Sequence, residues 1–215
     1  MFLTDDHQLG FIHIPRTGGT SVSESFALSP VNIKHVCRTH AHYSEYHGSA
    51  PAQWFATIRH PAARLHSGYY YQIEQDRKRL LGMLPLKSDL TLDFLQARID
   101  LFESYGFEQT IISEKFKKHY QNLKQKHSIQ SLNVLEQMQS ICKYIQGCEN
   151  IILFDIETQA DKLFEWIKQH ITFVNYTHNN NKLERSNWKD QLSDKLIEYI
   201  KNNYKDDLAR FDFQL

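Results

Sequence analysis

The sequence predicts an α/β protein in three layers, with a mostly parallel central sheet flanked by helices. Short apolar runs rich in Ile, Val or Phe alternate along the chain with longer amphipathic segments, which is the pattern of strands and helices in such a sheet. The 215 residues are enough for one well-buried core, and 41% hydrophobic with 23% charged residues is ordinary for a globular protein. We therefore expect residues 1–215 to form a single domain.

The first expected strand, residues 10–14, ends at a loop with an unusual composition. Residues 15–21 read P-R-T-G-G-T-S, and a helix is expected over residues 20–28. Glycines allow a ligand to approach the backbone, and the free N–H groups of a helix start attract anions. The loop predicts a phosphate- or sulfate-binding site. Its candidate residues are Arg16, Thr17, Gly18, Gly19, Thr20 and Ser21.

This loop is similar to a nucleotide-binding P-loop without matching the usual form. That form, G-x-x-x-x-G-K-[ST], places a Lys and a hydroxyl residue after the second glycine. Here no Lys follows Gly19, and the cation Arg16 precedes both glycines. A generic tight turn between strand and helix is the alternative explanation.

A second strand–helix junction follows two further expected strands, residues 32–36 and 54–58. Arg59 comes directly after the latter, at the strand end where open α/β sheets bind ligands. Pro61 suits the first turn of a helix, expected over residues 61–80. Arg64 and Ser67 lie in that helix, and we interpret Arg64 as a solvated helix charge rather than a phosphate ligand.

Together the two junctions resemble the cofactor loops of the sulfotransferases that use 3′-phosphoadenosine 5′-phosphosulfate (PAPS). The run I-P-R-T-G-G-T-S at residues 14–21 is similar to the family's 5′-phosphosulfate loop. The second junction is similar to its 3′-phosphate loop, with His60 where the family usually has Asp. The resemblance is nearest to the carbohydrate-type members, sulfotransferase family 2. It implies a P-loop-like fold, PAPS as sulfuryl donor without a required metal, and Arg59 and Ser67 on the 3′-phosphate.

The resemblance also implies the chemistry. Arg16 would neutralise the oxygen that leaves with the phosphate, and a base would accept the proton of the acceptor hydroxyl, expected on a carbohydrate. His40 and His42 form a His-x-His pattern similar to that of the uronyl 2-O-sulfotransferases, and a histidine suits proton transfer near neutral pH. Glu24, in the first helix, is the competing base. The sequence leaves the three open, with a slight preference for His40.

The remaining elements follow in order, beginning with a Lys-rich helical insertion at about residues 75–131 that could line the acceptor cleft. Its charge run at residues 76–79 is interpreted as a solvated helix end. Thr91 caps a helix in this insertion, and another helix is expected over residues 133–145. A strand at 150–154 precedes helices opened by Thr158 and Ser193. Arg185, in a polar stretch before the last helix, could contact the cofactor.

The composition excludes several classes. Lys+Arg and Asp+Glu balance at 25 each, which disfavours a nucleic-acid surface. Three sparse cysteines predict reduced thiols and a cytoplasmic location, and no run is long enough to span a membrane. The histidines lack metal-ligand spacing, so no metal site is expected. Two alternatives stay open: an ATP- or GTP-dependent phosphotransferase, with Asp155 as magnesium ligand, and a non-catalytic nucleotide-binding homologue.

Overall fold

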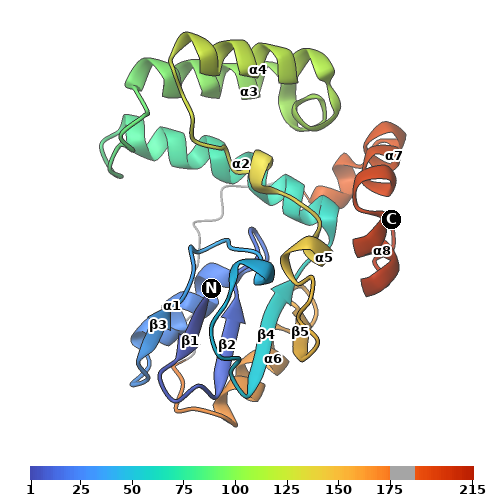
Figure 1. Ribbon diagram of the computed structural model, residues 1–215. Helices are drawn as coiled ribbons and strands as arrows, with labels where there is room; N and C mark the ends of the chain where they lie inside the picture. The colour runs from blue at the N-terminus through green and yellow to red at the C-terminus, as the bar shows by residue number, and fades with distance from the viewer. Residues whose placement is uncertain (175–186) are drawn as a thin grey trace. The chain divides into compact units, whose positions relative to one another are not determined.

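The computed structural model describes residues 1–174 and 187–215, which divide into two compact units (Figure 1). The sheet unit comprises residues 1–60, 139–174 and 209–212. The helical unit comprises residues 61–138, 187–208 and 213–215. Each unit is described by itself.

The sheet unit is built on five strands in the order β3-β1-β2-β4-β5 (Figure 1). Their bounds are β1 Phe2–Thr4, β2 Leu9–Ile12, β3 Ile33–His35, β4 Gln53–Ile58 and β5 Ile151–Asp155. β1 pairs antiparallel with β2 and β3, whereas β2, β4 and β5 pair in parallel. The α/β class is confirmed, but the sheet is mixed, because a short tight connection makes β1 and β2 a hairpin that the sequence analysis did not anticipate.

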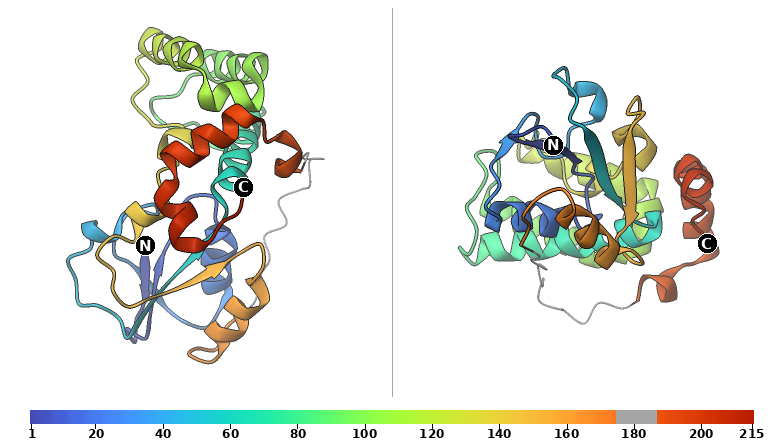
Figure 2. Two further views of the ribbon diagram at one scale, coloured as in Figure 1. Left: turned by 90° about the vertical axis from the view of Figure 1, so that its right-hand side faces the viewer. Right: turned by 90° about the horizontal axis from the view of Figure 1, so that it is seen from below.

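Two helices of the sheet unit, α1 (Gly19–Leu28) and α6 (Ala160–Lys168), lie on the same side of the sheet (Figure 2). Their apolar faces form a core with Phe11 of β2 and Phe55 of β4. On the other face, Trp54 of β4 packs edge-on against two tyrosines of the segment around η1 (Tyr43–Glu45). Gly10 of β2 makes room for Trp54, because a Cβ at position 10 would lie 2.5 Å from the indole ring.

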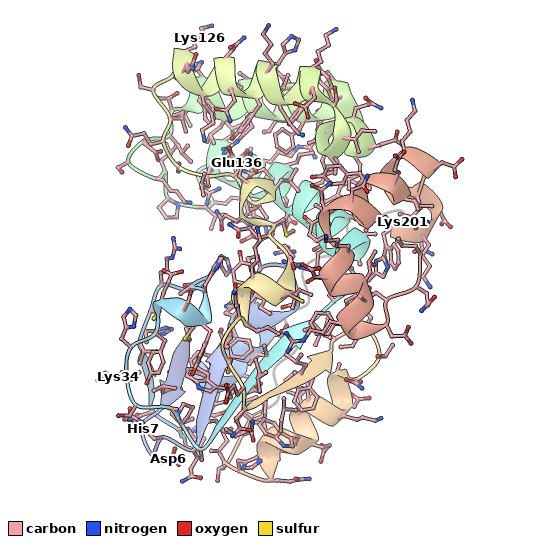
Figure 3. The ribbon with its side chains drawn as sticks, turned by 45° about the vertical axis from the view of Figure 1, so that its right-hand side comes forward. Asp6, His7, Lys34, Lys126, Glu136 and Lys201 are labelled. Carbon is pink, nitrogen blue, oxygen red and sulfur yellow. The ribbon has the colours of Figure 1, made fainter. Side chains whose placement is uncertain are left out.

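The helical unit contains α2 (Pro61–Leu80), α3 (Leu92–Ile112), α4 (Glu114–Lys126) and the short turns η2 (Leu135–Gln137) and η3 (Trp188–Gln191). α7 (Asp194–Asn203) follows, and α8 (Lys205–Phe211) contributes residues to both units. The expected caps are confirmed at Thr91 and Ser193, whose hydroxyls accept N–H bonds from Phe94 and Leu196. Exposed lysines, such as Lys126 on α4 and Lys201 on α7, carry the charge of this unit at its surface (Figure 3).

Two expected helices have different bounds. Residues 133–145 do not form one helix: only η2 and the four-residue α5 (Ile141–Tyr144) are helical there. Asn133 begins this first turn: its side chain accepts the N–H of Glu136 and its own N–H bonds to the Glu136 carboxylate, which is the pattern of a capping box. The helix assigned to Thr158 begins at Ala160, with Gln159 as its N-cap.

Among the described residues, none of the helices combines the length and the apolar character that a membrane span requires.

The charge run at residues 76–79 is not a solvated helix end, and that expectation is wrong for Asp76. Asp76 is fully buried and accepts two 2.7 Å hydrogen bonds from the guanidinium of Arg98 on α3. Gln72 donates to the same carboxylate at 3.1 Å, and its carbonyl oxygen accepts the N–H of Val134. The amphipathic pattern of α2 did not reveal this buried pair, because its partner is distant in sequence.

We expect Asp76→Ala to destabilise the protein by about 3–5 kcal/mol, because it leaves the buried Arg98 guanidinium without its carboxylate. The matched control is Arg77→Ala, which removes a cation that is 54% exposed and pairs with Glu103. That change should cost less than about 1 kcal/mol. Urea denaturation followed by circular dichroism measures both, and equal losses would mean that the buried pair contributes no more than the surface pair.

Candidate active site

The loop after β2 has the backbone of an anion-binding turn. Arg16 and Gly18 both adopt left-handed conformations, with φ of 62° and 84°. Gly18 is the N-cap of α1, and the first turn of α1 contains no acidic residue. Positive φ is costly for a residue with a side chain, so Arg16 is held there by its surroundings. The N-terminus of α1 thus carries a partial positive charge that no carboxylate of its own first turn offsets.

Thr17 fastens this loop to the sheet. Its side chain is fully buried, donates a 2.9 Å hydrogen bond to the carbonyl oxygen of Ile14 and lies 2.9 Å from the hydroxyl of Thr57 on β4. The sequence analysis counted Thr17 as a ligand residue. The Thr17 hydroxyl instead bonds within the protein, to Ile14 and Thr57. Any bond from Thr17 to an anion would therefore come from its backbone N–H.

The loops after the three parallel strands meet at one edge of the sheet. Ile156, just after β5, fills the space beside Gly18, where a Cβ would lie 2.7 Å from the isoleucine side chain. Arg59, just after β4, donates two hydrogen bonds of 3.2 and 3.1 Å to the carboxylate of Glu157. This pair is only partly exposed, at 26% and 28%. The structure therefore brings Arg59 and the Arg16 loop to the same edge, and it adds Glu157, which the sequence analysis missed.

His13, also missed, lies behind the loop. Its ring occupies the space beside Gly19, where a Cβ would come within 2.2 Å of it. The ring also meets His40 edge-on, with centroids 4.9 Å apart. The pKa of His13 is lowered to about 3, first by burial and then by the positive charges of His40, the amino terminus and Arg16. His13 is therefore neutral at physiological pH. The available signal was a polar residue within the apolar run that leads into the loop with the double glycine.

The two candidate histidines occupy different surroundings. The His40 ring contacts the ring of His13, which in turn lies beside Gly19, the first residue of α1. The loop of His40 is fixed by the amino group of Met1, which donates to the carbonyl oxygens of Arg38 and Thr39 at 3.1 Å each. His42 instead packs against the ring of Tyr144, with centroids 4.5 Å apart. The third candidate, Glu24, lies partly exposed in α1, beyond its first turn.

Two residues of the second junction belong to the helical unit. Ser67 lies in α2 and is 6% exposed. Arg64 is 1% exposed, and its guanidinium lies 3.8 Å from the carboxylate of Asp207, which is fully buried. Its interpretation as a solvated helix charge is therefore wrong. Arg185 lies outside the described residues.

Asp155, the magnesium ligand of the phosphotransferase alternative, stabilises the turn after β5. Its carboxylate accepts the N–H of Glu157, and its own N–H bonds to Gln159. Within residues 1–174 and 187–215, no three His, Cys, Asp or Glu side chains cluster as metal ligands would. This edge of the sheet thus brings together Arg59, Arg16 and the N-terminus of α1.

Comparison with protein families gives one match: the model of the sulfotransferase family covers residues 1–214. Searches of the curated proteins and of the solved structures give no significant match.

We expect the neutral His13 to make the fold sensitive to acid. The unfolded chain takes up a proton at this position below its ordinary pKa of about 6.5, whereas the folded protein does so only near 3. Protons therefore favour the unfolded state, and the free energy of unfolding decreases as the pH falls. Between pH 7 and pH 5 the loss should be about 2 kcal/mol.

The measurement compares urea denaturation of the wild type and His13→Gln at both pH values. His13→Gln should lack this part of the pH dependence, whatever its stability at pH 7. His47→Gln, which removes an exposed histidine of the same unit, is the control. If the wild type and His13→Gln lose stability in parallel, His13 is not held neutral in the folded state.

Proposed function

Because the chain belongs to the sulfotransferase family, we propose that it transfers a sulfuryl group from PAPS to an acceptor hydroxyl. PAPS supplies the activated sulfuryl group and leaves as adenosine 3′,5′-bisphosphate. We further propose that residues 1–215 act as one sulfotransferase domain.

The observation that supports PAPS as donor is the loop after β2. Gly18 is left-handed at the N-cap of α1, and the first turn of α1 has no acidic residue, so the backbone N–H groups and the partial positive charge of this helix start suit the charged 5′-phosphosulfate. Arg16 stands in this turn, while the buried Thr17 holds the turn against β4. We propose that the backbone of residues 17–21, the hydroxyls of Thr20 and Ser21, and Arg16 bind the phosphosulfate.

The 3′-phosphate is assigned to Arg59 and Ser67 from the sequence motif. Arg59 is supported by its place at the carboxyl end of β4, next in the sheet to β2. Its guanidinium already binds the Glu157 carboxylate, so a phosphate would have to share or replace that partner. Glu157 therefore lowers the affinity of Arg59 for phosphate and keeps the guanidinium oriented when no nucleotide is bound. Arg185 is proposed as a further cofactor contact on the same sequence grounds.

Transfer then needs charge stabilisation and one proton acceptor. We assign to Arg16 the neutralisation of the negative charge that grows on the departing phosphate oxygen, as a preorganised cation does in phosphoryl transfer. We assign to His40 the uptake of the acceptor's proton, because His40 lies beside His13 and the start of α1. The neutral His13 adds no positive charge beside His40, so it leaves His40 able to accept a proton.

The acceptor is proposed to be a carbohydrate hydroxyl. This rests on the nearness of the sequence motifs to the carbohydrate-type sulfotransferases. The helical segment at about residues 75–131 is proposed to contribute to the acceptor site.

We expect adenosine 3′,5′-bisphosphate to bind at least about tenfold more tightly than AMP in calorimetry, because only the bisphosphate offers a 3′-phosphate. Arg59→Ala and Ser67→Ala should each reduce this preference by about 1.5–3 kcal/mol. Glu157→Gln should strengthen bisphosphate binding, since it frees Arg59 from a competing carboxylate. Arg38→Ala, which removes an exposed arginine paired with Glu45, is the control and should change nothing.

Equal affinities for the bisphosphate and AMP would contradict the assignment of the second junction. Tighter binding of Mg-ATP than of the bisphosphate would favour the phosphotransferase alternative instead.

We expect Arg16→Ala to lower kcat roughly 10²–10³-fold, the loss found when one preorganised donor to a developing oxyanion is removed. Arg16→Lys should retain part of the rate. His40→Ala should lower turnover about 10²–10⁴-fold with bisphosphate affinity nearly unchanged, and should remove the acidic limb of the pH–rate profile. Labelled PAPS and a panel of glycans provide the assay.

His42→Ala is the matched control and should have the smaller effect, because its ring packs against Tyr144. If both histidine variants keep full turnover and Glu24→Ala does not, the carboxylate is the base.

A further inference from the structure

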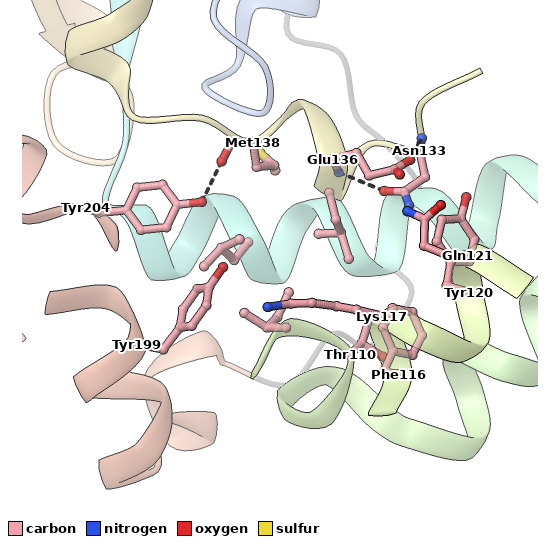
Figure 4. A pocket seen from close by; sticks show the side chains of 13 residues that line it. Thr110, Phe116, Lys117, Tyr120, Gln121, Asn133, Glu136, Met138, Tyr199 and Tyr204 are labelled. Carbon is pink, nitrogen blue, oxygen red and sulfur yellow. Dashed lines mark hydrogen bonds between the residues drawn. The ribbon is translucent and has the colours of Figure 1, made fainter. Parts of the chain in front are cut away.

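The helical unit contains a cavity of about 280 Å³ whose lining includes none of the residues assigned above to donor binding or proton transfer (Figure 4). α2, α3, α4, η2 and α7 all contribute to its wall, and Tyr204, just after α7, completes it. Its size is well above the cavity of about 150 Å³ that holds a benzene molecule in another protein. It therefore has room for a one- or two-ring molecule.

The wall is mainly apolar and aromatic. Phe116 and Tyr120, one turn apart on α4, stack with ring planes only 3° apart and are 4% and 3% exposed. Leu135 of η2 and Met138 just after it contribute further apolar surface. The Met138 methyl group packs onto Gly68 of α2, where a Cβ would come within 2.5 Å of it. Flat apolar molecules match such a wall best.

Two hydroxyls of this wall, those of Thr110 and Tyr120, have no hydrogen-bond partner among the described residues. The Tyr120 hydroxyl lies near the polar side chains of Arg98 and Asn133, so the Thr110 hydroxyl is the one considered for a ligand. Thr110 on α3 is 4% exposed, and its hydroxyl has no hydrogen-bond partner among the described residues. A helical threonine ordinarily bonds to the carbonyl four residues earlier. Here that residue is Gly106, whose φ of 67° and ψ of 176° interrupt the helix. A buried hydroxyl without a partner is costly, so a ligand with a matching polar group would relieve that cost.

The charged groups of the wall are already paired. Lys117 binds Glu114 at 2.6 Å, and Lys124 binds Glu136 at 3.3 Å. Glu136 also accepts the N–H of Asn133, and the Tyr204 hydroxyl donates to the carbonyl oxygen of Met138. A charged ligand would have to disrupt one of these pairs, so the wall favours an uncharged molecule.

We propose that this cavity binds a compact, uncharged aromatic molecule that carries a hydroxyl group, with the ring between the Phe116–Tyr120 stack and Met138 and the hydroxyl on Thr110. This site belongs to the helical unit alone and does not depend on sulfuryl transfer.

The experiment uses the full chain with ¹³C-labelled methionine methyl groups, whose three positions are Met1, Met83 and Met138. Met138 lines the cavity, Met83 is 66% exposed and Met1 is buried in the sheet unit. The probes are 4-methylphenol and 1,4-dimethylbenzene, which have nearly the same shape and differ in the hydroxyl. Each probe should shift the Met138 signal, identified with Met138→Leu, and should leave the other two signals in place.

Thr110→Val keeps the shape of the side chain and removes its hydroxyl. It should lower the affinity for 4-methylphenol about fivefold, as expected for the loss of one hydrogen bond. The affinity for 1,4-dimethylbenzene should not change. Leu135→Phe narrows the cavity and should lower the affinity for both probes. In each variant, a Met138 signal that stays apart from that of the exposed Met83 reports that the helical unit is folded.

Three results would overturn the proposal. The first is no shift of Met138 with either probe up to the limit of solubility. The second is an equal shift of all three methionine signals, which indicates unspecific binding. The third is an equal effect of Thr110→Val on both probes. The readout needs no sulfuryl donor, so it is independent of the outcome for the proposed activity.

Discussion

The contact between the hydroxyls of Thr17 and Thr57 is the interaction on which the candidate site depends. One buried side chain joins the loop after β2 to the next strand of the sheet, and the same hydroxyl also bonds to Ile14 at the start of the loop. A loop with two left-handed residues would otherwise relax to cheaper conformations. With the loop fixed, the start of α1 and Arg16 keep their positions before any ligand arrives. Preorganisation of this kind lets a site stabilise charge without first rearranging.

Positively charged groups and a neutral histidine lie side by side at this fixed loop. Arg16 and the start of α1 provide positive potential, and behind them lies the neutral ring of His13. A second protonated ring there would repel both Arg16 and a protonated His40. Burial keeps His13 neutral, so the positive charge is concentrated where an anion can reach it. Glu157 has the complementary effect on Arg59, because it balances a cation that would otherwise stand without a partner at the sheet edge.

Local sequence signals predicted much of this structure. The bounds of α2 followed from Pro61 and the periodic pattern behind it, and hydroxyl caps located the starts of α3 and α7. The resemblance of two loops to the sulfotransferases is confirmed by the match over residues 1–214. What could not be predicted depends on partners far apart in the chain. The pairs Asp76–Arg98, Arg64–Asp207 and Arg59–Glu157 join segments whose proximity only the fold creates. Periodicity reports which face of a helix is apolar, and it does not report that a charge on that face has a buried partner.

The two adjacent glycines of the loop illustrate how one motif can contain separate constraints. Gly18 is required for its left-handed backbone, whatever surrounds it, whereas Gly19 is required because the ring of His13 fills the space of a side chain. The first constraint is local, and the second is shared between two positions. In the evolution of this loop, position 19 should therefore be free to gain a methyl group only in lineages where position 13 has first become smaller, while position 18 gains no such freedom. Substitutions at positions 13 and 19 would then occur together in evolution because the two residues are in contact, and the substitution at position 13 would have to come first.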